Sequence, residues 1–117
     1  MKKAYKFYND TYFQTFIFLP NWTRDDLIKT FKLDPDEDGR GMVFYHNGAV
    51  FIWIQEFTYE NLGYLAHEAT HAANCMFREK GVKISTSNDE PLAYMVGYVF
   101  ENCMKYFKKK STRRKKV

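Results

Sequence analysis

The longest helical pattern in this chain covers residues 59–80, YENLGYLAHEATHAANCMFREK. Its apolar residues recur every three or four positions, the spacing of one buried helix face. Thr58 is placed to cap this helix and Gly81 to end it. We therefore expect one helix over residues 59–80, with the motif HEATH (67–71) near its middle.

Two histidines four residues apart lie on one face of a helix, where each can give a ring nitrogen to the same zinc ion. His67 and His71 have this spacing, and Glu68 follows the first histidine. From there Glu68 flanks the metal and can act as a general base that takes a proton from a zinc-bound water. The motif predicts a hydrolytic zinc site. The alternative is a structural helix in which each histidine is hydrogen-bonded to a neighbour.

A catalytic zinc site needs a third protein ligand, and acids at the start of the next predicted helix are the candidates. Glu90 follows His71 after eighteen residues, enough for one helix to end and a second to return. Asp89 is the second candidate, as a ligand or as an acceptor for an imidazole N–H. The alternative is a capping box in which Glu90 binds the backbone N–H of Ser87. We predict that Glu90 is the ligand, because the two histidines otherwise lack a partner.

Five further residues have side chains that suit such a site. Tyr94 and Tyr98 could donate a hydrogen bond to a tetrahedral intermediate, although core or surface positions are the simpler interpretation among nine tyrosines. His46 is most simply a surface residue, with a ligand or oxyanion role as the alternative. Cys75 is rotated too far around the helix to share a zinc ion easily, so we expect Cys75 and Cys103 to be buried thiols.

The motif His67-Glu68-x-x-His71, followed after eighteen residues by Glu90, resembles the gluzincin branch of zinc metallopeptidases. The resemblance covers about residues 50–105 and implies a minimal zincin-like domain. It implies that His67, His71 and Glu90 hold zinc and that Glu68 is the general base. It also implies that residues 49–54 form the strand that borders the cleft and holds a peptide in extended form. The stretches HEATHA and DEPLAY are similar to small phage-encoded proteins as well.

The chain also departs from the gluzincin pattern. Thermolysin-like enzymes place an acid four residues after the glutamate ligand, and Tyr94 occupies that position here. The upstream glycine-rich motif of the aminopeptidases is missing, and 117 residues leave no second lobe to form a deep cleft.

The remaining sequence predicts an α+β domain with a small antiparallel sheet packed on the motif helix and a C-terminal helix. Residues 5–19 are rich in aromatic and β-branched side chains and predict one strand, or two short ones around Asn9-Asp10. Asn21 or Thr23 caps a predicted short helix that runs through Phe31. Residues 42–46 and 49–57 predict a hairpin across Asn47-Gly48. Pro91 opens a last helix that we expect to reach Phe107.

The charges divide the chain into two parts. Residues 1–107 hold eleven basic and all fourteen acidic residues, a net charge of −3, and we expect them to form one domain. Residues 108–117 carry seven positive charges and predict a basic, disordered tail. Such a tail can contact nucleic acid through phosphates, or an acidic partner.

The chain shows no secretory signal pattern, no run long enough to span a membrane, and only two cysteines. We therefore expect a cytoplasmic protein, in the host cytoplasm if it is phage-encoded, without a membrane partner. The predicted function is a zinc-dependent peptidase that acts on a peptide or protein. The alternative is a non-catalytic, zinc-containing binding module whose basic tail engages nucleic acid or a host protein.

Overall fold

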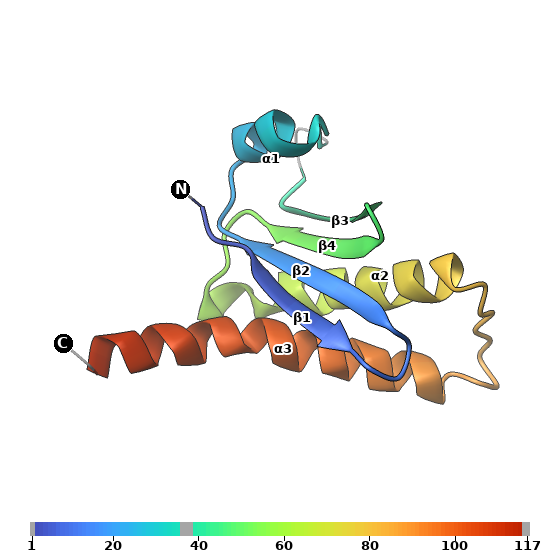
Figure 1. Cartoon of the computed structure of the whole chain (residues 1–117). Coiled ribbons are helices and arrows are strands. Elements are labelled where there is room, and N and C mark those ends of the chain that lie inside the picture. The colour runs from blue at the N-terminus through green and yellow to red at the C-terminus, as the bar shows by residue number, and fades with distance from the viewer. Residues whose placement is uncertain (1, 36–38, 116–117) are drawn as a thin grey trace.

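The computed structural model describes residues 2–35 and 39–115, the last seven of these by backbone alone. It is an α+β fold of one four-stranded sheet and three helices (Figure 1). The strands are β1 (Tyr5–Asn9), β2 (Gln14–Pro20), β3 (Gly41–His46) and β4 (Ala49–Ile54). The helices are α1 (Arg24–Phe31), α2 (Leu62–Glu79) and α3 (Glu90–Lys115), with a 3-10 turn at Tyr59–Asn61 just before α2.

The sheet has the order β1-β2-β4-β3 and is mixed, whereas we expected it to be antiparallel throughout. The two hairpins are antiparallel, but β2 and β4 pair in parallel. The reason lies in β4, in which all six residues are buried. A strand that is apolar on both faces belongs inside a sheet, so β4 takes the central position beside β2. The half-buried β3 is left at the edge.

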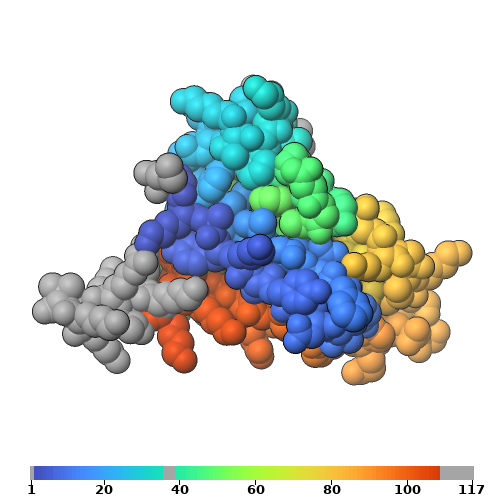
Figure 2. Space-filling model, in the orientation of Figure 1, coloured from blue at the N-terminus to red at the C-terminus, as the bar shows by residue number. Residues whose placement is uncertain are grey.

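The helices cover the sheet from both sides. Helices α2 and α3 pack on one face over a core that includes Phe16, Phe18, Val50 and Ile52. Helix α1 covers the other face over a smaller cluster that includes Leu19, Leu27, Phe51 and Trp53. In the space-filling view α1 forms the top of the molecule and α3 its lower side, with the strands between them (Figure 2). None of the helices among residues 2–35 and 39–115 is both long and apolar enough to cross a membrane.

Local signals in the sequence set several boundaries. Thr23 caps α1 in a capping box with Asp26. Asn47 and Gly48 both adopt positive φ, 50° and 81°, as a two-residue type I′ turn requires. Residues 5–19 form two strands rather than one, and the strand predicted for 49–57 ends at Ile54.

Helix α3 crosses the boundary that we predicted between the domain and the tail. Its backbone continues through residues 108–115, where we expected disorder. Lysine and arginine are good helix formers, so the basic segment can prolong the helix that precedes it. The side chains of residues 109–117 lie outside the described residues, as do the three acidic residues Asp36, Glu37 and Asp38.

Asn21 joins the end of β2 to the rest of the molecule. It lies in the left-handed region with φ of 66°, and its backbone N–H donates to the Ile54 carbonyl at 2.8 Å. Its side-chain oxygen accepts from the Phe57 N–H at 2.8 Å, and its amide donates to the Tyr106 hydroxyl at 3.0 Å. One residue therefore connects the sheet, through its backbone, to the segment that enters α2 and to α3, through its side chain.

Replacing Asn21 with glycine should lower the free energy of unfolding by about 1–3 kcal/mol, because the Phe57 N–H loses its acceptor. Glycine tolerates the positive φ, so backbone strain does not contribute. The matched control is Asn47→Gly, which also changes a left-handed asparagine but whose side chain bonds only the neighbouring His46 ring among the described residues. Urea unfolding of both variants measures the difference, and equal losses would contradict the role of Asn21.

Candidate metal centre

The motif lies in the middle of α2, where its three candidate residues, His67, Glu68 and His71, differ in exposure. Helix α2 packs its buried face, which includes Leu65, Ala72 and Met76, against the sheet. At about 100° per residue, His67 and His71 fall on the opposite side, and both are exposed. Glu68 lies between these two faces and is only 7% exposed. The same helix thus offers two accessible imidazoles and one buried carboxylate.

The two imidazoles are arranged as ligands of a single ion would be. The Nε2 atoms of His67 and His71 are 3.2 Å apart, and the rings meet edge to face with centroids 4.7 Å apart. Two nitrogens bound tetrahedrally to one zinc at 2.0–2.1 Å would be about 3.3–3.4 Å apart. Among the described residues these nitrogens have no other hydrogen-bond partner. The pair therefore fits two positions of a zinc coordination sphere.

Glu68 is held against the edge strand at Gly41. A Cβ atom added to Gly41 would be 2.8 Å from Oε2 of Glu68 and 2.9 Å from the Trp53 carbonyl oxygen. Real Cβ atoms do not approach other atoms so closely, so the Glu68 carboxylate can lie here only because residue 41 has no side chain. This is a close backbone approach of the kind that glycine in a strand often marks.

The surroundings of Glu68 change its acidity. Burial raises the pKa of the carboxyl group above its usual range, and positive charge on His67 or His71 acts in the opposite direction. A general base works best when its pKa lies near the working pH. The raised pKa of Glu68 shifts this carboxylate toward that condition.

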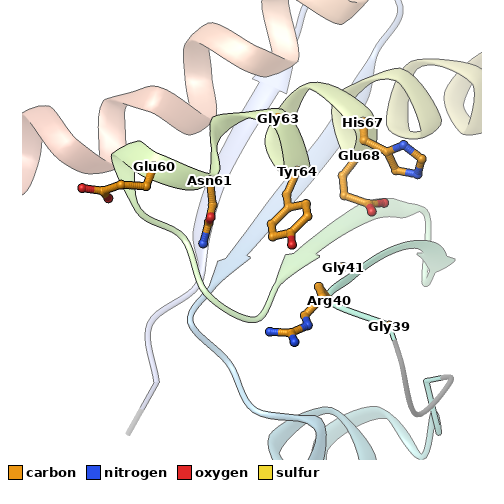
Figure 3. Close-up of a pocket in the computed structure, with 9 residues that line it drawn as sticks. All are labelled: Gly39, Arg40, Gly41, Glu60, Asn61, Gly63, Tyr64, His67 and Glu68. Atoms are coloured by element: carbon orange, nitrogen blue, oxygen red, sulfur yellow. The ribbon is translucent and has the colours of Figure 1, made fainter.

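Two cavities meet at the motif. The larger has a volume of about 720 Å³ and includes Arg40, Gly41, Tyr64, His67 and Glu68 in its lining. The smaller, about 330 Å³, extends toward the C-terminal end of α2 and adds residues such as Val43 and His71. In Figure 3, Tyr64, His67 and Glu68 project from α2 on one wall, and Arg40 and Gly41 form the other. Together the cavities make a groove between α2 and β3.

The resemblance implied that residues 49–54 form the strand that borders the cleft. In the structure, the strand that borders this groove is β3. Residues 49–54 form β4, which is buried between β2 and β3. The pairing of His46 with Ala49 across the two-residue turn sets the hydrogen-bond pattern of the hairpin, and the Gln55 N–H donates to the Arg40 carbonyl at 2.8 Å. In an antiparallel pair these bonds alternate, so Gly41, Val43 and Tyr45 direct their backbone groups to the free edge.

The structure does not bring Glu90 or Asp89 to the histidines. Both acids are exposed at the start of α3, where the Asp89 carbonyl accepts the Ala93 N–H at 2.9 Å. Within residues 2–35 and 39–115, no group of three or more His, Cys, Asp or Glu side chains is placed to hold a metal. The Ser87 hydroxyl lies 3.1 Å from that of Ser85. The ligand role of Glu90 stays a prediction.

The separation of Glu90 and Asp89 from the two histidines follows from the order of the strands in the sheet. Helix α3 runs beside β1, where the Tyr98 hydroxyl donates to the Tyr8 carbonyl at 2.6 Å, whereas α2 approaches β3 at Gly41. Strands β1 and β3 are the two opposite edges of the sheet. An acid at the start of α3 therefore lies on the other side of α2 from the groove.

The other candidates also lie apart from the histidine pair. Tyr94 is 52% exposed and stacks on Tyr98 on the β1 side of α3. His46 is at the end of β3, and its ring centroid lies 5.5 Å from that of Phe31, the last residue of α1. Cys75 and Cys103 are buried free thiols, as expected, and burial raises the pKa of both. Cys75 lines the smaller cavity.

Sequence reasoning missed Gly41, Arg40 and Tyr64. The predicted strand began at Met42 and did not include Gly41, although a glycine in or beside a strand can mark a close backbone approach. That signal could have identified Gly41. The position of Arg40 depends on which strand is at the edge, and the sequence did not reveal this.

Comparisons with protein-family models, with curated proteins and with solved structures found no match for this chain.

The raised pKa of Glu68 predicts a pH-dependent gain in stability for Glu68→Gln in metal-free protein. The wild-type carboxyl favours the folded state while it is protonated, and this contribution is lost as pH rises through the raised pKa. Glutamine mimics the protonated form at every pH. The melting temperature of the variant should therefore exceed that of the wild type at pH 8, and the gap should close below about pH 4, under the ordinary pKa of glutamate.

The control for this measurement is Glu60→Gln, which changes an exposed carboxylate on the same cavity. It should show no such gain at pH 8. A Glu68→Gln protein that melts below the wild type across the whole pH range would contradict the cost of burying this carboxylate.

Proposed function

We propose that this protein is a zinc-dependent peptidase in which His67 and His71 hold the metal and Glu68 is the general base. The observation that carries the proposal is the 3.2 Å separation of the two Nε2 atoms beside a buried carboxylate at the edge of a sheet. A helix with a purely structural role gains nothing from this combination, because a buried carboxylate without a cationic partner costs stability.

Zinc in such a site would act as a Lewis acid toward a substrate carbonyl and would lower the pKa of water. The residues of this chain supply the rest. Glu68 accepts the proton of the attacking water on a carboxylate oxygen and then donates it to the leaving amine nitrogen. Its contact with Gly41 fixes the carboxylate beside the histidines.

The free edge of β3 supports a peptide as the substrate. Backbone N–H and C=O groups on an edge strand can pair with an extended peptide, which then becomes an added strand. The outward-directed groups of Gly41 and Val43 lie along the groove that His67, Glu68 and His71 also line. A bound peptide backbone would thus pass directly over the proposed metal and base.

The first test is the zinc content of the purified protein. We expect about one equivalent per chain after supply of zinc, and His71→Ala should lose most of it. His46→Ala is the matched control, because it removes the one histidine that lies outside the motif. Elemental analysis without chelator measures all three proteins. Absence of zinc from the unaltered protein, or equal loss in the two variants, would refute the metal site.

The variant Glu90→Ala tests the third-ligand prediction in the same assay. If Glu90 is a ligand, the start of α3 must approach the other side of α2, and this variant should lose as much zinc as His71→Ala. If the variant retains its zinc, Glu90 is not a ligand, and His67 and His71 remain the two ligands that the proposal names.

The second test separates binding from chemistry. Glu68→Gln removes the base but no proposed ligand, so zinc content should stay at the wild-type level. Hydrolysis of a peptide mixture, followed by mass spectrometry, should fall by about two to four orders of magnitude. Unchanged hydrolysis would remove Glu68 from the mechanism, and loss of zinc together with activity would make it a ligand.

A further inference from the structure

Arg40 is a cationic side chain in the larger cavity that no described residue neutralises. It is exposed, it lines the cavity of about 720 Å³, and within residues 2–35 and 39–115 it has no hydrogen-bond or ion-pair partner for its guanidinium. Arg24 provides the contrast, since its guanidinium pairs with the Asp34 carboxylate at 3.0 Å. The guanidinium of Arg40 is available to a ligand.

The backbone of Arg40 holds this guanidinium close to the proposed base. The Arg40 carbonyl accepts the Gln55 N–H at 2.8 Å, which extends the β3–β4 pairing by one residue. The next residue, Gly41, is in contact with Glu68. Arg40 is therefore carried into the cavity one residue away from the point where the strand meets the catalytic carboxylate.

Two carboxylates, those of Glu60 and Glu68, also line the cavity, and neither forms an ion pair with Arg40. Tyr64 is exposed on the opposite wall, and Figure 3 shows its hydroxyl directed toward the Arg40 side. Glu60 also lines the cavity, but its carboxylate points away from Arg40 in the same view. A guanidinium with a nearby hydroxyl suits a carboxylate, to which arginine can donate two parallel hydrogen bonds.

The direction of the groove indicates which side of the substrate reaches Arg40. From Gly41 to Val43, β3 follows α2 from Glu68 toward Cys75, and Arg40 precedes this stretch. Antiparallel strand pairs are slightly more stable than parallel ones. A peptide that pairs with β3 in antiparallel fashion has its C-terminal side at Gly41 and beyond it Arg40.

We propose that Arg40, with Tyr64, forms a subsite for a substrate carboxylate on the C-terminal side of the cleaved bond. The carboxylate belongs either to an acidic side chain or to the free C-terminus of the peptide. This inference rests on the proposed peptidase function, because it uses the position of Glu68 and the binding edge of β3. It assigns a substrate class that neither the motif nor the zinc pair specifies.

Binding to the Glu68→Gln protein tests the subsite without turnover. The probes are fluorescent, C-terminally amidated octapeptides in which each position in turn is Glu or Gln, measured by polarisation at low salt with and without added zinc. A second pair compares one Gln peptide with a free and with an amidated C-terminus. A Glu peptide, or the free C-terminus, should bind about tenfold more tightly than its neutral partner, the effect of a charge-assisted pair, and added salt should weaken the preference.

Three variants made in this background locate the subsite. Arg40→Met should abolish the preference for the carboxylate, whereas Lys29→Met, which removes an exposed charge on α1, should keep it. Arg78 lines the other cavity, and Arg78→Met should also keep the preference. The inference is overturned if no Glu peptide binds more tightly than its Gln partner and the free C-terminus binds no more tightly than the amidated one. It is also overturned if Arg78→Met abolishes the preference and Arg40→Met does not.

Cleavage by the protein with Glu68 intact supplies the second readout. In a mixed peptide library, acidic residues or free C-termini should be enriched on the C-terminal side of the cut, and Arg40→Met should remove this enrichment. Enrichment on the N-terminal side overturns the assigned direction. A preference in binding without any cleavage would refute the proposed peptidase function but would support the carboxylate subsite.

Discussion

The contact between Gly41 and Glu68 is the constraint on which the groove depends. At this point the backbone of an edge strand and the side chain of a helix approach so closely that a Cβ atom cannot fit between them. The approach buries the carboxylate and raises its pKa. It also places the free edge of β3 beside the exposed histidines. A larger residue at position 41 would meet the Trp53 carbonyl and displace the Glu68 carboxylate, which would change the acidity and the position of Glu68 together.

Strand β4 explains why β3 is available at the edge. Its sequence AVFIWI is apolar on both faces, with Val50 and Ile52 toward α2 and Phe51 and Trp53 toward α1. Burial of a large apolar side chain contributes about 1.5–3 kcal/mol, so an edge position for β4 would forgo much of this stabilisation. The central place of β4 leaves β3 with one pairing partner. The groove beside the motif is thus a consequence of hydrophobic sorting within a hairpin.

Much of the local structure could be predicted from the sequence. The spacing of apolar residues located α2, Thr23 marked the start of α1, and Asn47-Gly48 marked the hairpin turn. These features depend on residues close together in the chain. The parallel pairing of β2 with β4 depends on a comparison between two strands far apart in sequence, and periodicity within either strand does not contain it.

The candidate site also combines features that depend on residues close together in the chain with features that depend on how distant elements pack. The pair His67 and His71 is a property of one helix, and its geometry follows from the four-residue spacing. The position of Glu90 is a property of two packed helices, and a count of eighteen residues fixes the length of the connection but not the side of α2 on which it returns. Arg40 entered the site only through the edge position of β3. Sequence reasoning therefore reached the histidine pair and Glu68, and missed the wall opposite them.

The distribution of polarity in α2 argues that this wall and the motif act together. A helix optimised only for stability would place Glu68 in solvent, since an ionised carboxylate is costly where it is 7% exposed and has no salt-bridge partner among the described residues. The two exposed imidazoles, whose Nε2 atoms are 3.2 Å apart, lie on the same helix beside this carboxylate. Local departures from the stable choice tend to gather at functional sites. One groove is bordered here by a buried acid, a facing pair of imidazoles and an arginine without an ion-pair partner among the described residues. An edge strand exposes its backbone along the same groove. A polar substrate is the partner that would use all of these groups.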